Sequence, residues 1–174
     1  TYGIFGVTKL NHEGQTTTSK GNYDLFLSKT NDIGEIEWVR QFWSTLADQD
    51  GYKSLAIDAE NNVYVGGCIK TNDNAWTTTI ANTTQTRPTT QLLSAGDENI
   101  FLTKLNPQGN VIWSVLEENS DSCIRSLDID PITDELYAGG YYTSLITGSL
   151  FGQEVKGTED TFVAKIDKSN GAAD

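Results

Sequence analysis

The sequence predicts an all-β protein. Two phrases, "YDLFLSKTNDIGEIEW" (23–38) and "ENIFLTKLNPQGNVIW" (98–113), match without a gap at six positions. β-branched and aromatic residues fill the expected strands, and Asn, Asp, Gly and Pro lie between them, as they do in tight turns. No window of the sequence shows an amphipathic helical period. The chain therefore contains the same strand–turn–strand unit at least twice.

A second shared phrase lies between these copies. "SLAIDAENNVYVGG" (54–67) resembles "SLDIDPITDELYAGG" (126–140), which has one extra residue in its turn, and "DTFVAK" (160–165) is a third copy of the first phrase. Each unit is thus expected to contain four short strands. In the complete middle unit these strands are Lys53–Ala59, Val63–Lys70, Asn99–Leu105 and Val111–Glu117.

Four strands per unit, repeated along one chain, are typical of a β-propeller, whose blades are four-stranded sheets. Short turns join the first two and the last two strands, so we expect "SLAID" innermost, then "VYVGG", "FLTKL" and the outermost "VIWSV". The chain then forms one partial β-propeller over 1–174. It divides into a partial blade at 1–43, a complete blade at 44–117 and a partial blade at 118–174. This makes about two and a half blades, an incomplete ring, because a closed ring needs at least about four. Either the chain is part of a longer polypeptide, or several copies of it complete a ring.

Large aromatic residues and paired glycines recur at fixed places in these units. Phe101 and Trp113 are expected to fill the space between neighbouring sheets. The pairs Gly66-Gly67 and Gly139-Gly140 are expected where a side chain would obstruct the close approach of backbone. Packing therefore explains why the unit keeps these residues.

Composition excludes some classes of partner. The chain has 174 residues, no Met and a net charge of −12. Nucleic acid and anionic lipid are disfavoured, because binding to either needs clustered Lys and Arg. No signal peptide is evident, and no apolar run is long enough for membrane insertion. We expect a mature form or an excerpt of a longer polypeptide.

The two cysteines, Cys68 and Cys123, leave two alternatives open. They form a disulfide if the compartment is oxidising, or they are two buried free thiols. Neither has metal-ligand spacing, and the single His12 has no evident catalytic partner.

Acidic residues gather in "DIDPITDE" (128–135), where Asp128, Asp130 and Asp134 suggest calcium. A calcium-binding EF-hand loop needs an oxygen ligand at its fifth position and Gly at its sixth, and this run has Ile and Thr there. The alternative is a hairpin in which Asp130 binds the turn backbone and Pro131 presets the turn. The matching Asp58 favours the turn, because its copy lacks the other carboxylates.

The sequence offers two catalytic alternatives. The carboxylate pairs are Asp48/Asp50 and Glu117/Glu118. A glycosidase needs a defined separation between its two carboxylates, which the sequence does not give. The pattern G-x-x-x-W (34–38 and 109–113) also occurs in quinone-cofactor repeats, but no polar clamp accompanies it. We therefore expect no catalytic residue, no metal and no cofactor in this chain.

Binding is expected on the face that carries the long connections, because loops on a rigid scaffold commonly bind partners. These connections are the irregular segments 9–23, 44–52, 71–97, 118–123 and 144–160. The longest, 71–97, contains Trp76 and Arg87, residue types enriched in binding hot spots. Tyr52 and Tyr142 are further candidates, and Asn82 lies in an N-x-[ST] acceptor for glycosylation. The alternative is that Trp76 only packs the loop on its own blade.

Taken together, "FLTKLNPQGNVIW", "SLDID", "ELYAGGYYTS" and "GTEDTFVAK" resemble the bacterial β-propeller repeat family. The resemblance spans nearly the whole chain, with a longer segment at 71–97 and "NGAAD" where a strand with Trp is usual. It implies a propeller of a large secreted or surface protein with a binding or structural role.

We therefore predict a non-catalytic propeller segment of a larger extracellular or cell-surface protein. Its partner is a protein or glycan, or the remaining blades of the same protein. One alternative is a purely structural segment inside an assembly. The other is an enzyme whose active centre lies in blades outside this chain.

Overall fold

The computed structural model is built from β-strands, and the residues that it describes contain no helix. It describes residues 2–7, 9–12, 15–18, 24–42, 53–69, 77–80, 83–86, 99–117, 121–143, 149–150, 153–154 and 159–173. Side chains are described within 26–40, 54–68, 99–115, 122–143 and 159–173. The predicted all-β class is confirmed.

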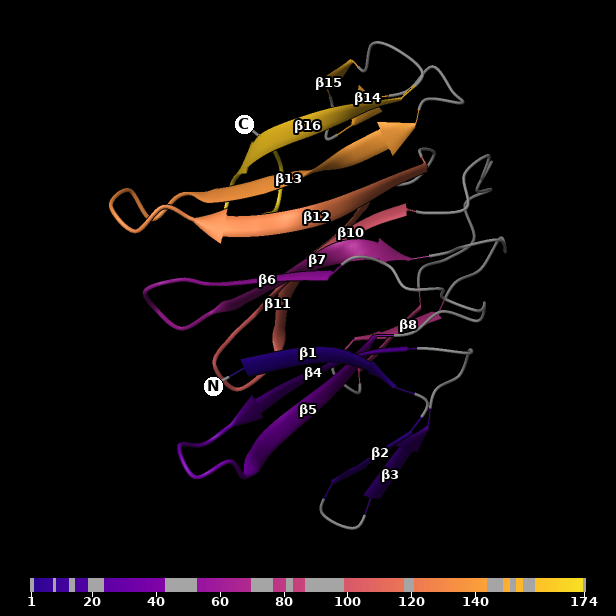
Figure 1. Ribbon diagram of the computed structural model, residues 1–174, viewed down its shortest axis with the longest axis vertical. Coiled ribbons are helices and arrows are strands. Elements are labelled where there is room, and N and C mark those ends of the chain that lie inside the picture. The colour runs from indigo at the N-terminus through magenta and orange to yellow at the C-terminus, as the bar shows by residue number, and fades with distance from the viewer. Residues whose placement is uncertain are drawn as a thin grey trace. The chain divides into compact units, whose positions relative to one another are not determined.

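Three main sheets, all antiparallel, organise these strands (Figure 1). The first sheet has the order β1 (Tyr2–Val7), β4 (Asp24–Thr30), β5 (Ile36–Phe42). The second sheet has the order β11 (Val111–Glu117), β10 (Asn99–Leu105), β7 (Val63–Ile69), β6 (Lys53–Ile57). The third sheet has the order β12 (Asp121–Ile129), β13 (Leu136–Thr143), β16 (Glu159–Ile166). None of the three closes on itself.

The second sheet follows the predicted strand order, and its strand limits agree closely with those expected. β10 and β11 have the predicted bounds, whereas β6 ends at Ile57 and β7 at Ile69. β6 stops early because the next residue, Asp58, has turned its carboxylate to accept hydrogen bonds from the turn backbone.

The two hairpins that contain the matching phrases at 23–38 and 98–113 have the same register. Lys29 pairs with Trp38, and Lys104 pairs with Trp113. In each hairpin the register shifts directly after the lysine. The sequence match therefore corresponds to the same backbone pairing, including the same irregularity.

The turns of these hairpins also agree. The Oδ1 atom of Asn31 accepts hydrogen bonds from the second and fourth following N–H groups, and so does that of Asn106. Gly34 and Gly109 have φ of 87° and 76°, a conformation that glycine adopts at little cost. The spacing Asn-x-x-Gly thus encodes one particular turn.

The chain forms two compact units. One unit comprises residues 1–50 and 70–90 and holds the first sheet with two small hairpins. These are β2 (Lys9–His12) with β3 (Gln15–Thr18), and β8 (Thr77–Ile80) with β9 (Thr83–Thr86). The other unit comprises 51–69 and 91–174 and holds the second and third sheets. It also holds the hairpin of β14 (Ser149–Leu150) and β15 (Gln153–Glu154).

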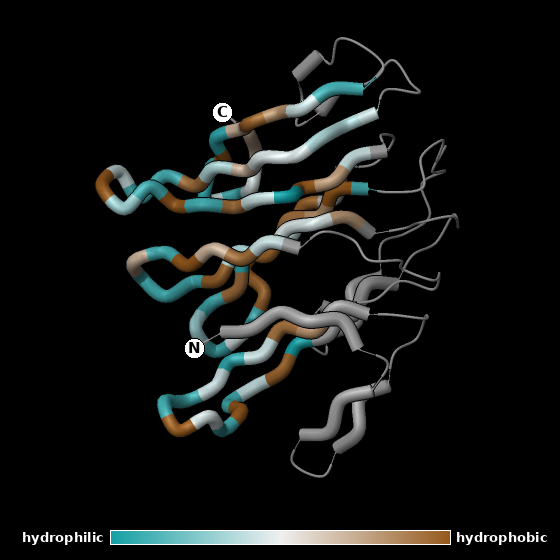
Figure 2. The backbone as a smooth tube through the Cα atoms, in the orientation of Figure 1, coloured by the Kyte–Doolittle hydropathy of each residue, from teal (hydrophilic) through white to brown (hydrophobic). Residues whose placement is uncertain are grey.

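The described hydrophobic core of the second unit lies between its two large sheets, where β12 packs against β6, β7 and β10. β10 is almost entirely buried and largely hydrophobic (Figure 2). The buried core cluster consists of Ala56, Tyr64, Ile100, Leu102, Ile124, Leu127, Leu136, Ala138, Tyr142 and Ile166. Trp113 and Phe162 pack against it, as do Ile129, Ala164 and Ala173. Phe101 is 6% exposed.

Glycine allows close packing at two of the predicted positions. A Cβ on Gly66 would lie 3.1 Å from a methyl group of Leu127, and one on Gly140 would clash with the carbonyl oxygen of Cys123. At Gly139 the nearest atom would be at 3.8 Å, an ordinary contact. The predicted close approach of backbone is confirmed at Gly140. At Gly66 the close atoms belong to side chains of the next sheet, and at Gly139, on the other side of the strand, the described residues make only an ordinary contact.

A disulfide joins the two large sheets of this unit. Cys68 of β7 and Cys123 of β12 are bonded, with their Cα atoms 4.7 Å apart. The structure thus selects the disulfide over the two free thiols.

Candidate functional site

Each main sheet has a connection that contains a separate two-stranded hairpin. β2–β3 lies between β1 and β4, β8–β9 between β7 and β10, and β14–β15 between β13 and β16 (Figure 1). No hairpin joins the ladder of a main sheet. These connections were expected to be irregular, so the paired backbone is a correction to that expectation.

The cause of the β8–β9 hairpin is visible in its sequence. "TTTI" and "TTQT" are rich in β-branched threonine and are separated by only two residues, Ala81 and Asn82. Two β-prone runs at that spacing are a hairpin signal. Thr77 pairs with Thr86. The structure thus has a hairpin within 71–97, where the sequence analysis predicts one long irregular loop.

The predicted binding residues fall mainly outside the described part of the chain. Trp76, Arg87 and Tyr52 lie outside it, although in the sequence Trp76 directly precedes β8 and Arg87 directly follows β9. Tyr142 is described, is 7% exposed and belongs to the core cluster. Packing explains the position of Tyr142, and its role in binding stays a prediction.

A buried polar cluster lies at the turn between β6 and β7. Asp58 Oδ1 accepts hydrogen bonds from the N–H groups of Glu60 and Asn62, at 3.1 and 2.7 Å. Its Oδ2 accepts from Asn62 Nδ2 at 2.9 Å and from the Tyr64 hydroxyl at 3.0 Å. Asp58 is 5% exposed and Tyr64 is fully buried. The turn and the adjacent strand are thus tied to one carboxylate.

The third sheet provides a cover for this cluster. Lys104 Nζ lies 3.9 Å from Asp58 Oδ2 and 5.2 Å from the centre of the Tyr64 ring. It donates a hydrogen bond of 3.1 Å to the carbonyl oxygen of Lys168, in the turn that follows β16. Trp113 Nε1 donates to the same oxygen at 3.0 Å. The cluster therefore joins the two sheets by polar contacts as well as by apolar packing.

The surroundings of this cluster favour an ionised Asp58 and a neutral Tyr64. Burial raises the pKa of Asp58, but hydrogen bonds from Asn62 and Tyr64 outweigh it and hold the pKa below its usual value. Burial, followed by the bond to Asp58, raises the pKa of Tyr64 far above its usual value. A general acid or base works best with a pKa near the working pH. These two groups shift away from neutrality, so the cluster is suited to holding structure.

A related set of side chains lies at the surface of the third sheet. The Tyr137 hydroxyl donates to Glu135 Oε2 at 2.8 Å, and Lys165 Nζ donates to Glu135 Oε1 at 3.0 Å. The hydrogen bond to Glu135 raises the pKa of Tyr137, and the bonds from Lys165 and Tyr137 lower the pKa of Glu135. This set is exposed or half-buried.

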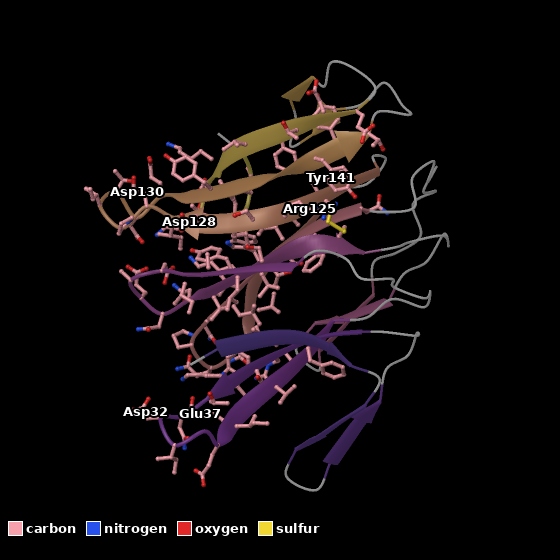
Figure 3. All side chains as sticks on the ribbon, in the orientation of Figure 1. Asp32, Glu37, Arg125, Asp128, Asp130 and Tyr141 are labelled. Atoms are coloured by element: carbon pink, nitrogen blue, oxygen red, sulfur yellow. A yellow bond between two sulfur atoms is a disulfide. The ribbon has the colours of Figure 1, made fainter. Side chains whose placement is uncertain are left out.

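The acidic run at 128–134 forms the predicted turn. Asp130 Oδ1 accepts hydrogen bonds from the N–H groups of Ile132 at 2.7 Å and Thr133 at 3.2 Å (Figure 3). These bonds lower the pKa of Asp130. The turn role of Asp130 is therefore confirmed. Across the described ranges, no three His, Cys, Asp or Glu side chains are grouped so that they could hold a metal ion.

The residues of the catalytic alternatives are only partly described. Asp48, Asp50 and Glu118 lie outside the described residues, and only the backbone of Glu117 is described. Of the tryptophans in G-x-x-x-W, Trp113 packs on the core and Trp38 is 9% exposed. Packing is thus sufficient to explain both tryptophans.

Sequence reasoning missed one surface, the outer side of the third sheet. The guanidinium carbon of Arg125 lies 4.8 Å from the ring centre of Tyr141 (Figure 3). Val163 on β16 is 81% exposed. Phe162 and Ala164 pack on the core and Val163 between them does not, but the sequence is apolar at all three positions and so gives no sign of this alternation.

No protein-family model matches the chain, and no curated protein matches it. In the described ranges, no helix is long and apolar enough to cross a membrane.

Proposed function

We propose that the chain is a non-catalytic segment of a β-propeller that serves as a binding and structural scaffold. Each main sheet has a meandering strand order, and corresponding strands pair in the same register, as blades of one repeat would. On this proposal the sheets are blades, about two and a half in number, and further blades of the same repeat complete the ring. The resemblance to the bacterial β-propeller repeat family supports the same arrangement.

The observation that carries the binding role is the presence of a hairpin in the same connection of each sheet. Segments outside the main ladder can vary in sequence without disturbing the sheet, and loops beside a rigid scaffold commonly carry binding residues. Binding sites are commonly built in this way. We propose that a protein or a glycan binds here, with Trp76 and Arg87, next to the β8–β9 hairpin in the sequence, as its main contacts.

The Cys68–Cys123 disulfide supports an extracellular or cell-surface location. Disulfides form and persist in oxidising compartments and are rare in reducing ones.

The test replaces 71–97 with a short Gly-containing turn and measures binding to an array of glycans and purified extracellular proteins. We expect ligands bound by the natural chain to be lost, with the melting temperature little changed, since loop length alters closure entropy by only about 0.6 kcal/mol per doubling. Trp76→Ala should weaken binding by at least about 2 kcal/mol.

The matched control is Ile132→Ser, at an exposed turn residue of the third sheet. It should leave binding unchanged. Undiminished binding after replacement of 71–97 would refute the proposed site. A lower melting temperature with intact binding for Trp76→Ala would show that Trp76 only packs the loop.

A further inference from the structure

The second sheet contacts the third sheet through a defined set of residues. The outer side of the third sheet carries an equivalent set. The contact residues of the second sheet are Ser54, Tyr64, Gly66, Leu102 and Lys104. The corresponding residues of the third sheet are Ser126, Tyr137, Gly139, Val163 and Lys165. We call this second set the outer face.

Backbone pairing fixes the correspondence without reference to side-chain type. Gly66 pairs with both Ser54 and Leu102. Gly139 likewise pairs with both Ser126 and Val163. In the same way Tyr64 pairs with Lys104, and Tyr137 pairs with Lys165. The residue types agree at four positions, and Leu is replaced by the similar Val at the fifth.

In the second sheet, two of these residues determine how closely β12, the first strand of the third sheet, can approach. Ser54 Oγ accepts a hydrogen bond of 2.6 Å from the N–H of Leu127. Gly66 leaves space for the side chains of Leu127 and Ile124, whose methyl groups would lie 3.1 and 3.2 Å from a Cβ. A serine and a glycine thus admit a strand of aliphatic residues.

The other three positions supply the buried contacts. Tyr64 and Leu102 are fully buried in the core cluster. Lys104 reaches the carbonyl oxygen of Lys168 in the covering turn. The second sheet therefore needs a neighbouring sheet to bury these groups.

On the outer face, the equivalent positions lack such a neighbour within the described residues. Val163 is 81% exposed, Ser126 is exposed, and Tyr137, Gly139 and Lys165 are half-buried. The third sheet thus has an exposed valine at the position where the second sheet has a fully buried leucine.

We propose that the outer face docks a further sheet of the same repeat, carried by the same polypeptide. Its first strand would present aliphatic residues as Ile124 and Leu127 do, with an N–H aimed at Ser126. The turn after its third strand would offer a carbonyl oxygen to Lys165. This inference rests on the propeller arrangement proposed above, but it does not depend on binding by the connections.

A second copy of the chain fits the outer face less well. In the described residues, the first sheet lacks a strand equivalent to β6 or β12. The third sheet has such a strand, but its contacts are already used by its own second sheet. A further repeat unit supplies an unused set of the same contacts.

The test extends the full chain by repeating residues 112–173 directly after Ala173. The join continues the pattern of the second sheet, because the Ile166–Ala173 bridge corresponds to the pairing of Leu105 with Val111. The added segment carries its own copy of Cys123. Tyr141→Cys then places a thiol at the position equivalent to Cys68, because Tyr141 is the second residue after Gly139 and Cys68 is the second residue after Gly66.

We expect the introduced thiol to form a disulfide with the added copy of Cys123, while Cys68–Cys123 is retained. Peptide mapping by mass spectrometry without reduction identifies both bonds. Ile132→Cys, at a 92% exposed turn residue, is the matched control and should not form the bond. An introduced thiol that stays free, or that reacts no more than the control, would overturn the proposal.

A second measurement does not depend on cysteine. Val163→Lys should lower the melting temperature of the extended chain and leave that of the natural chain unchanged. Ile33→Lys, at an 80% exposed turn residue, should alter neither. Equal melting of the extended chain with and without Val163→Lys would refute docking on this face.

Sedimentation of the natural chain tests the other occupant. We expect its association state to be the same with and without Val163→Lys. Self-association that this substitution abolishes would identify a second copy as the occupant and refute the proposed further repeat. Loss of ligand binding with the new disulfide intact would instead count against the proposed function alone.

Discussion

The second and third sheets place the same three residue types at the same points of their strands, yet the side chains bond differently. The sets are Asp58, Tyr64 and Lys104 in the second sheet, and Asp130, Tyr137 and Lys165 in the third. In the second sheet the tyrosine donates to the aspartate, and the lysine reaches the backbone of the next sheet. In the third sheet the tyrosine and the lysine both turn to Glu135.

The difference follows from what covers each set. The turn after β16 lies over the first set and excludes water, so each buried polar atom needs a partner inside the protein. At the surface, water can form hydrogen bonds with the same groups, so the tyrosine and the lysine need no buried partner and bond to the nearby Glu135. Burial is accordingly the main cause of the raised pKa of Tyr64, whereas hydrogen bonding to Glu135 is the main cause for Tyr137. A repeated sequence thus specifies the strands but leaves the bonding of side chains to the neighbouring sheet.

The largest effect should come from removing the covalent tie between the two sheets. The double substitution Cys68→Ser with Cys123→Ser opens a loop with a sequence separation of 55. In the chain-entropy view this lowers the free energy of unfolding by about 4 kcal/mol. Urea denaturation of the natural chain and the variant measures the loss. Equal denaturation midpoints would show that the buried core and the polar contacts keep the second and third sheets together without the disulfide.

Removing the buried aspartate should have the next largest effect. Asp58→Ala leaves Tyr64 and Asn62 without their shared acceptor and Lys104 without its nearby carboxylate, which should destabilise the protein by roughly 3 kcal/mol. Asp130→Ala is the matched control, and its cost should be clearly smaller because water can replace the lost bonds. Thermal melting of both variants gives the comparison. Similar decreases in melting temperature would contradict the idea that burial under a neighbouring sheet distinguishes the Asp58 set from the Asp130 set.

The smallest effect concerns the tyrosines and depends on pH. Tyr64→Phe should cost roughly 1 kcal/mol near neutral pH, because one buried hydrogen bond is lost. The pKa of Tyr64 is raised by folding, so its contribution is complete below about pH 10, the usual tyrosine value, and declines as the pH rises further. The stability gap between the natural chain and Tyr64→Phe should therefore narrow above that pH.

Tyr137→Phe provides the control for this titration. The difference in the free energy of unfolding between the natural chain and Tyr137→Phe should be smaller at neutral pH, because this hydrogen bond lies at the surface. Urea denaturation at several alkaline pH values measures both gaps. A Tyr64 gap that widens with pH would contradict the assigned sign.

Much of the fold could be predicted because its signals are local. The turn residues Asn31 and Gly34 recur as Asn106 and Gly109, and they specify the same turn wherever they occur. Strand limits in the second sheet followed from similar signals. The hairpin at 77–86 was missed although its signal is local too, since its threonine runs lie within a longer polar segment.

The candidate sites were harder to predict. Tyr142 was chosen as a loop residue, yet it lies in the core cluster because β13 continues to Thr143. The outer face was not foreseen, because Val163 looks like any strand valine until its paired positions are known. Residue type gave no sign of which side of the sheet would be covered.

The sequence by itself determined the class, the strands and the turns, since these depend on residues only a few positions apart. Tertiary structure decided the fate of Cys68 and Cys123, the partner of each tyrosine and the side of the third sheet that stays open. These features depend on segments that meet only after folding, when one sheet has removed water from another. Burial is a property of that contact, and no single strand encodes it.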